Sequence, residues 1–235
     1  MKSKSKKIMC AISFVLSIAW IVILKTVDVG AVGPKGSKVG LSLINSSFHD
    51  LWHYDDGIGY NKFWYDISKY SGYLALGIVG LLGLFGLFQL IKRRNLFKVD
   101  HCILAAGVLY IVTGCVYVFF EFVIINYRPL IMPDEKELEA SFPSSHTVLT
   151  IVVLGSLILL AKNYIEKKSA RMIFQFATLL ILIAAVLGRI ICGVHWFSDL
   201  IGGMLISMFL LSAFSIFNKK KLGKKDEDDI YSIEA

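Results

Sequence analysis

The sequence predicts an all-α, polytopic membrane protein, a bundle of six transmembrane helices, from its composition and from its long apolar runs. Hydrophobic residues make up 56% of the 235 residues and charged residues only 18%, whereas soluble domains average about 45–50% and 25%. The mean hydropathy is +0.65. The net charge of +7 therefore favours a membrane rather than a nucleic acid as the partner. The four cysteines lie singly, which excludes a disulfide framework or a zinc site built on cysteine pairs.

Six apolar runs approach the length of about 20 residues that a membrane-spanning helix needs. They are Ile8–Leu24, Gly72–Ile91, Ile103–Asn126, Ser144–Ala161, Met172–Ile191 and Leu200–Phe217. The fourth run is the weakest, because its purely apolar part begins only after His146. A cleavable signal peptide is the alternative reading of the first run, but its length favours an uncleaved anchor.

Basic residues gather in four clusters that separate or flank these runs. They are Lys2, Lys4, Lys6 and Lys7; Lys92, Arg93, Arg94 and Lys98; Lys162, Lys167, Lys168 and Arg171; and Lys219, Lys220, Lys221, Lys224 and Lys225. With six spans all four clusters fall on one side, and basic residues near helix ends stay in the cytoplasm. We therefore predict a single domain over residues 1–235 in the cell membrane, with both termini and the charged tail 219–235 cytoplasmic.

The opposite side receives an aromatic-rich outer loop, residues 27–71, together with the shorter segments Tyr127–Pro143 and Cys192–Asp199. Aromatic side chains collect at membrane interfaces because their rings are apolar and their tips polar. Within the loop, Val39–Trp52 has the apolar spacing of a short helix lying on the surface. The loop either caps the bundle or guides a substrate, and its composition leaves both roles open.

A few ionisable residues lie within or beside the apolar runs, where they are costly and indicate a functional site. They are Glu121, Arg128, His146, Arg189, His195 and Asp199. Three local signals have a structural explanation: Arg128-Pro129 would end a helix, Pro143-Ser144-Ser145-His146 would begin one, and His195 and Asp199, four apart, would stabilise a turn. All six nevertheless fall toward the predicted outer face, and this convergence favours a shared site.

These residue types indicate phosphoryl transfer. Two arginines bind phosphate oxygens in bidentate fashion, and a helix N-terminus at Ser144 and Ser145 adds backbone N–H donors. Two histidines divide the roles of nucleophile and general acid. A glycine-rich phosphate loop is absent from the sequence, which argues against a nucleotide-driven kinase or ATPase.

The same residues resemble the three-part signature of the type 2 phosphatidic acid phosphatase family. Its pattern reads Lys-x6-Arg-Pro, Pro-Ser-Gly-His and Ser-Arg-x5-His-x3-Asp, and the chain has Arg128-Pro129, Pro143-Ser144-Ser145-His146 and Arg189-x5-His195-x3-Asp199. The likeness covers about Glu121 to Gly203. It implies a core like that of acid phosphatases and vanadium haloperoxidases, no metal or other cofactor, and a lipid phosphate or lipid pyrophosphate as substrate.

The resemblance also implies roles for individual residues. His195 would be the nucleophile that forms a phosphohistidine, Asp199 would hold and activate it, and His146 would protonate the leaving oxygen. The phosphate-contacting positions would be Arg128, Arg189, Ser144 and Ser145, the last through its backbone N–H.

Three departures from the signature bear on activity. Ser145 replaces the glycine, Gly188 replaces the serine before Arg189, and Glu121 stands where the first lysine is expected. On a continuous helix Glu121 lies two turns before Arg128, about 10 Å along the axis and on the same face.

An ion pair of Glu121 with Arg128 or Arg189 is the interpretation we favour. The alternatives are recognition of a cationic or hydroxyl-bearing part of the substrate, or a weakened phosphatase. Lys136 is a candidate replacement for the missing lysine. Two further functions stay open: a catalytically silent protein that binds lipid phosphates, and a transferase that passes the phosphoryl group to another lipid.

Overall fold

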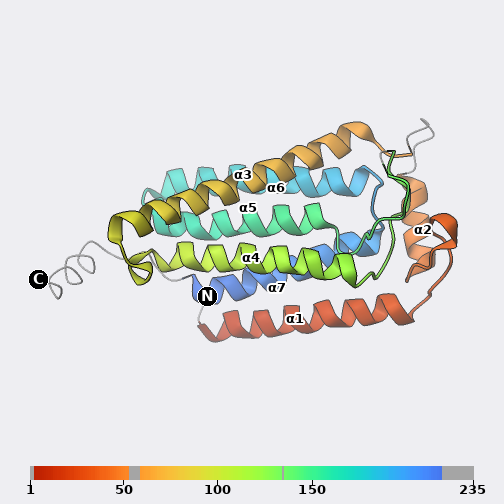
Figure 1. Ribbon diagram of the computed structural model, residues 1–235, viewed down its shortest axis with the longest axis horizontal. Helices are drawn as coiled ribbons and strands as arrows, with labels where there is room; N and C mark the ends of the chain where they lie inside the picture. Colours follow the sequence, from red (N-terminus) through yellow and green to blue (C-terminus); the bar gives the residue numbers. More distant parts are fainter. Residues whose placement is uncertain (1–2, 53–58, 134, 219–235) are drawn as a thin grey trace, which may run out of the picture.

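The computed structural model describes residues 3–52, 59–133 and 135–218, and over these residues it is a bundle of helices (Figure 1). The helices are α1 (Ser3–Thr26), α2 (Ser42–Leu51), α3 (Lys62–Arg93), α4 (His101–Phe122), α5 (Ser145–Tyr164), α6 (Lys168–Ile191) and α7 (Phe197–Phe217), with short 3-10 turns at Pro34–Gly36 and Leu96–Lys98. The described segments contain no β-strand, only two isolated bridges. The predicted all-α class is confirmed.

Six of these helices are long and apolar enough to cross a membrane: α1, α3, α4, α5, α6 and α7. Each corresponds to one of the six predicted runs. Their outward side chains are largely apolar, as at Leu81, Ile111 and Ile173, which are each more than 65% exposed. A surface of this kind is stable against lipid and not against water, so the chain is a multi-pass membrane protein.

Helix α3 begins ten residues earlier than predicted, so the outer loop ends at Asn61 rather than at residue 71. The first ten residues of α3 mix aromatic side chains with charged ones such as Lys62, Asp66 and Lys69, and their average hydropathy is too low to signal a span. The Asn61 side chain accepts a hydrogen bond from Trp64 N and caps the helix. Helix α4 ends at Phe122 instead of residue 126.

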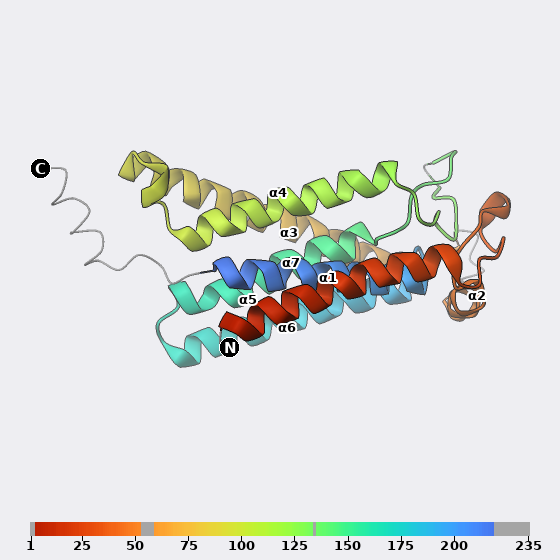
Figure 2. The same cartoon turned by 90° about the horizontal axis from the view of Figure 1, so that it is seen from below.

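Helices α5 and α7 form the centre of the bundle. Half of the most apolar stretch of each is buried inside the protein, against 11% for α3. In Figure 2, α7 lies between α1 and α5, and these pairs are in contact. The residues that precede or begin α5 and α7 are therefore fixed by the best-packed part of the fold.

The two ends of the bundle differ in chemistry. The start of α1, the α3–α4 and α5–α6 connections and the end of α7 lie at one end, and α2 lies at the other (Figure 1). The basic clusters that the structure describes are therefore gathered at a single end. The tail 219–235 and Lys2 lie outside the described residues.

A buried ion pair ties three helices together at this basic end. Asp100, with a fully buried side chain, lies 3.0 Å from Arg93 Nη1 and accepts hydrogen bonds from Gln89 and Tyr164 at 3.0 and 2.8 Å. Burial by itself would raise the pKa of Asp100, but the hydrogen bonds from Arg93, Tyr164 and Gln89 outweigh it and hold the pKa below its usual value. The pair joins α3, α5 and the start of α4.

The predicted surface helix at Val39–Trp52 is confirmed as α2, and it covers the N-terminus of α7. The Asn45 side chain accepts from Ser198 N at 3.0 Å and donates to Ser198 Oγ at 2.9 Å. On the other side Trp20 of α1 donates its indole N–H to Ser198 O at 3.0 Å. The N-terminal part of the chain thus holds the first turn of α7 in place.

Candidate active site

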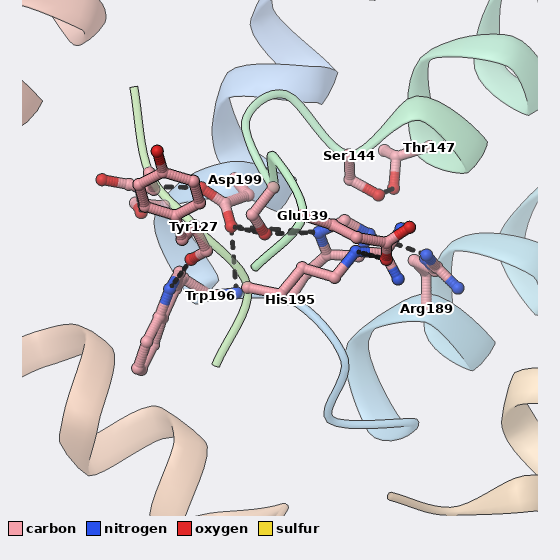
Figure 3. A network of polar contacts seen from close by, with 12 residues as sticks. Tyr127, Glu139, Ser144, Thr147, Arg189, His195, Trp196 and Asp199 are labelled. Atoms are coloured by element: carbon pink, nitrogen blue, oxygen red, sulfur yellow. Dashed lines mark hydrogen bonds and ion pairs between the residues drawn. The ribbon is translucent and has the colours of Figure 1, made fainter. Parts of the chain in front are cut away.

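His195 lies in the turn between α6 and α7 and is 3% exposed. Gly193 gives this turn its shape: its φ is +80°, and a Cβ there would lie 2.7 Å from the carbonyl oxygen of Trp52, so only glycine suits both the backbone and the space. Figure 3 shows the imidazole of His195 among Arg189, Asp199 and Glu139. The structure therefore brings the predicted nucleophile and its predicted partners together.

Asp199 lies in the first turn of α7, fully buried. Its Oδ1 accepts from Asn126 Nδ2 at 3.0 Å, and its Oδ2 accepts from the backbone N–H of Trp196 at 3.1 Å. Oδ2 lies 3.9 Å from His195 Nδ1, which is too long for a hydrogen bond. The hydroxyl of Ser141 fills the gap, 2.5 Å from Oδ2 and 2.9 Å from Nδ1.

Arg189, in the last turn of α6, is 1% exposed. Its Nη2 donates to His195 Nε2 at 2.7 Å, and the ring of Tyr65 lies 5.6 Å from its Cζ. Its Nε and Nη1 are buried and have no hydrogen-bond partner among the described residues. Unpaired buried donors cost about 1–3 kcal/mol each, so this pocket favours a ligand that offers anionic oxygens.

The surroundings of His195 keep its imidazole neutral. Burial lowers the pKa of His195 well below 6.5, and the positive charges of Arg189 and Arg128 and the nearby His146 lower it further. Because a guanidinium can only donate, Nε2 of His195 is the acceptor in its contact with Arg189. Its lone pair therefore points toward the arginine, as a nucleophile for an arginine-bound phosphate requires.

His146 is the second residue of α5 and lines the same pocket. It packs edge-on against Gly72 of α3, where a Cβ would lie 2.9 Å from His146 Cδ2. Its Nδ1 is buried without a hydrogen-bond partner among the described residues. The charges of Arg189, Arg128 and Lys69 all act on this imidazole, so His146 belongs to the same electrostatic cluster as His195.

The two serines before His146 differ in position. Ser144 is fully buried, and its hydroxyl accepts from Thr147 Oγ1 at 2.9 Å instead of lining the pocket. Ser145 begins α5 and does line the pocket. The first backbone N–H groups of a helix have no partner within it, so the amides that follow Ser144 are available to an anion.

The predicted pairing of Glu121 with an arginine is wrong. The prediction assumed a helix continuous to Arg128, but α4 ends at Phe122 and the chain turns. Arg128 instead lies beside Glu139, with Nε and Oε2 3.0 Å apart. Their segments are also joined by the hydrogen bond from Arg128 N to Glu139 O at 3.1 Å. No ion pair within the described segments joins Glu121 to an arginine; it lies near Tyr117, one helical turn back.

Lys136, the candidate replacement for the missing lysine, is exposed and does not line the pocket. Lys69 is half-buried on α3, one turn before Gly72, and its charge reaches His146. The same helix, α3, also explains why glycine replaces the serine of the signature at position 188. A Cβ at Gly188 would lie 3.1 Å from Trp64 O of α3, so a serine there would crowd the contact between α3 and α6.

The pocket is a cavity of about 730 Å³ between α3, α4 and α5, within the size range of small-ligand sites. Its apolar wall includes Leu76, Val79, Val116, Phe120 and Leu149, and its polar end includes Glu121, Arg128, Ser145, His146 and His195. An amphiphile with an anionic head fits this distribution. In the part of the chain that the structure describes, no three His, Cys, Asp or Glu side chains lie close enough to hold a metal ion.

Comparison with known proteins places this architecture in a family. Residues 103–222, just over half of the chain, match the model of the PAP2 superfamily. The fold is similar to the crystal structure of the first transmembrane PAP2-type phosphatidylglycerolphosphate phosphatase from Bacillus subtilis. The TM-score is 0.62 and the identity 14%, over 89% of this chain and 95% of that one. No curated protein matches. The chain belongs to the PAP2 superfamily, the type 2 phosphatidic acid phosphatase family of membrane phosphatases.

Proposed function

We propose that the protein is a lipid-phosphate phosphatase that works through a phosphohistidine on His195. The observation that carries this proposal is the pair of unpartnered, buried donors on Arg189, directly beside the Nε2 lone pair of His195. His195 lines the polar end of an apolar cavity, together with Arg128 and His146. A phosphate monoester on a lipid satisfies the donors and offers its phosphorus to the imidazole.

In the first step the phosphate binds Arg189, Arg128 and the backbone N–H groups at the start of α5. Nε2 of His195 forms a bond to phosphorus as the bond from phosphorus to the lipid oxygen breaks. Protonated His146 gives its proton to that leaving oxygen. Asp199 stabilises the positive charge that develops on the imidazole ring of His195.

In the second step water attacks the phosphorus of the phosphohistidine. His146, now neutral, takes a proton from the water, and the N–P bond breaks. Inorganic phosphate leaves, and His195 is again neutral. The two histidines thus return to their starting states after one lipid phosphate and one water are consumed.

The substrate class we propose is a lipid phosphate or lipid pyrophosphate, such as phosphatidic acid, phosphatidylglycerol phosphate or a polyprenyl pyrophosphate. The length of the apolar wall between α3 and α4 supports a chain-bearing substrate. We propose that hydrolysis needs no metal ion. We also propose that the site faces the extracytoplasmic side, because it lies at the opposite end from the basic clusters.

Lys69 is our proposed replacement for the missing first lysine of the signature, since its charge reaches His146 from α3. Glu121 is then free for another role. It lines the cavity near Tyr117, and a carboxylate and a phenol together favour a hydroxyl-bearing or cationic headgroup. Ser144 supports the site through Thr147 and the start of α5, and Ser145 through its backbone N–H.

The test is phosphate release by the purified protein in detergent across a panel of lipid phosphates and pyrophosphates, with and without a chelator. We expect turnover that persists in chelator and is abolished in His195→Ala. The matched control is Ser207→Ala, a buried hydroxyl on α7 that bonds only its own helix. Turnover that survives in His195→Ala would refute the mechanism.

The same assay separates the alternatives. Binding of lipid phosphates without turnover anywhere in the panel indicates a silent binding protein. Appearance of the phosphoryl group on an added acceptor lipid, in place of free phosphate, indicates a transferase.

A further inference from the structure

We propose that Ser141 is a positioning residue that connects Asp199 to His195, so that the carboxylate acts on the imidazole through a hydroxyl. This inference rests on the proposed function. The geometry is direct: Ser141 Oγ lies 2.9 Å from His195 Nδ1 and 2.5 Å from Asp199 Oδ2, whereas Nδ1 and Oδ2 are 3.9 Å apart.

The hydrogen bonds that join Arg189, His195, Ser141 and Asp199 all run in one direction, from donor to acceptor. Arg189 only donates, so Nε2 of His195 accepts, and the ring proton of the neutral imidazole lies on Nδ1. Nδ1–H then donates to Ser141 Oγ. The Ser141 hydroxyl donates its own hydrogen to Asp199 Oδ2, because an ionised carboxylate only accepts. His195 has a further hydrogen bond to the backbone of Ser141.

The backbone holds the Ser141 hydroxyl in this place. Ser141 is 2% exposed, and its N–H donates to the carbonyl oxygen of Asn126 at 2.9 Å. The side chain of the same Asn126 donates to Asp199 Oδ1. One residue, Asn126, thus holds both the backbone of the serine and the carboxylate of Asp199.

These hydrogen bonds from Arg189 through His195 and Ser141 to Asp199 matter most when the imidazole of His195 becomes positively charged. As Nε2 attacks phosphorus, Nδ1–H becomes a stronger donor, and Ser141 lies where that hydrogen bond is made. Removing the hydroxyl leaves Nδ1 and Oδ2 3.9 Å apart. This distance is longer than the usual donor–acceptor distance of about 2.7–3.2 Å in an N–H···O hydrogen bond. The ring then loses its connection to the carboxylate, while Arg189 still donates to Nε2.

The kinetic test uses the full-length protein in detergent, with phosphate release measured for wild type, Ser141→Ala, Ser141→Thr and the control Ser207→Ala. We expect Ser141→Ala to lower kcat about 10- to 100-fold, the loss of one hydrogen bond to a charged system, with KM nearly unchanged. Ser141→Thr keeps the hydroxyl and should recover most of the loss. Wild-type kcat in Ser141→Ala, or equal loss in Ser141→Thr, would overturn the inference.

A second readout does not depend on turnover. The ¹⁵N chemical shift of His195 Nδ1 reports the strength of the hydrogen bond that this nitrogen donates. We expect the Nδ1–H tautomer in both proteins, because Arg189 still donates to Nε2, and a shift of the Nδ1 resonance toward a weaker hydrogen bond in Ser141→Ala. An unchanged Nδ1 resonance overturns the role of Ser141 even if the wild type releases no phosphate, so failure of the proposed function and failure of this inference give different results.

Discussion

Replacing Gly72 by alanine tests whether the closeness of α3 to His146 matters for catalysis. The added Cβ would lie 2.9 Å from His146 Cδ2, whereas ordinary contact begins at 3.4 Å. The imidazole or the helix must therefore yield by about half an ångström. A misplacement of about 1 Å at a reacting group costs on the order of 10²-fold in rate, so a shift of half that size predicts a loss of roughly tenfold in kcat.

Gly77 supplies a matched control on the same helix, because a Cβ there meets nothing within 4 Å. Phosphate release and the thermal unfolding midpoint in detergent are measured for the wild type, Gly72→Ala and Gly77→Ala. We expect Gly77→Ala to keep full activity and to gain about 0.5–1 kcal/mol of stability from the removal of a helical glycine. We expect Gly72→Ala to lose turnover while remaining folded.

The result that would refute this reasoning is a Gly72→Ala protein as active as Gly77→Ala. In that case α3 moves aside without moving the imidazole, and its contact with His146 does not position the general acid that we propose.

Three further predictions concern charge. Glu121→Lys, which restores the lysine of the signature, should leave the protein folded and active but change its order of preference among headgroups in the lipid panel. The pKa of His195 is lower in the folded protein than its ordinary 6.5, so the unfolded chain gains a proton below pH 6.5 that the folded protein does not. Stability should therefore fall with decreasing pH below 6.5, by up to about 1.4 kcal/mol per pH unit, and this dependence should flatten in His195→Gln when melting is followed between pH 7.5 and 5. Asp100→Ala removes the buried carboxylate that Arg93, Gln89 and Tyr164 share and should destabilise the protein by about 3 kcal/mol without changing kcat at low temperature.

Each of these has a contrary outcome. Complete loss of turnover in Glu121→Lys gives Glu121 a direct part in the chemistry. Parallel melting curves for wild type and His195→Gln remove His195 as the source of the pH dependence. A lower kcat in folded Asp100→Ala couples the basic end of the bundle to the site.

The sequence predicts the fold well because burial in lipid imposes a simple pattern. All six spans appear as apolar runs, and errors fall at their ends, as at the start of α3, where Lys62 and Asp66 interrupt the pattern. The clustering of Arg189, His195 and Asp199 with His146 was also predictable, since motif spacing and span order place them at one end. Their roles in the reaction remain a prediction.

The rest of the site depends on contacts that no spacing encodes. Ser141 and Asn126 reach Asp199 from a loop whose path is set by the backbone pairing of Tyr127 with Ala140. Tyr65 and Lys69 lie on the first turns of α3, which the sequence pattern predicted to begin only at Gly72. Glu121 was misplaced for the opposite reason: a spacing of seven residues fixes a shared face only while the helix continues.

Several side chains that hold the site lie outside the segment matched to the family. Asn45 and Trp20 form hydrogen bonds with Ser198, the residue before Asp199. Tyr65 lies beside Arg189, and Gly72 packs against His146. Evolution can therefore retune the chemistry of this protein through its first hundred residues, with every signature residue left as it is. A chimera that joins residues 103–222 to the N-terminal half of a distant relative would keep the motif and lose its supports.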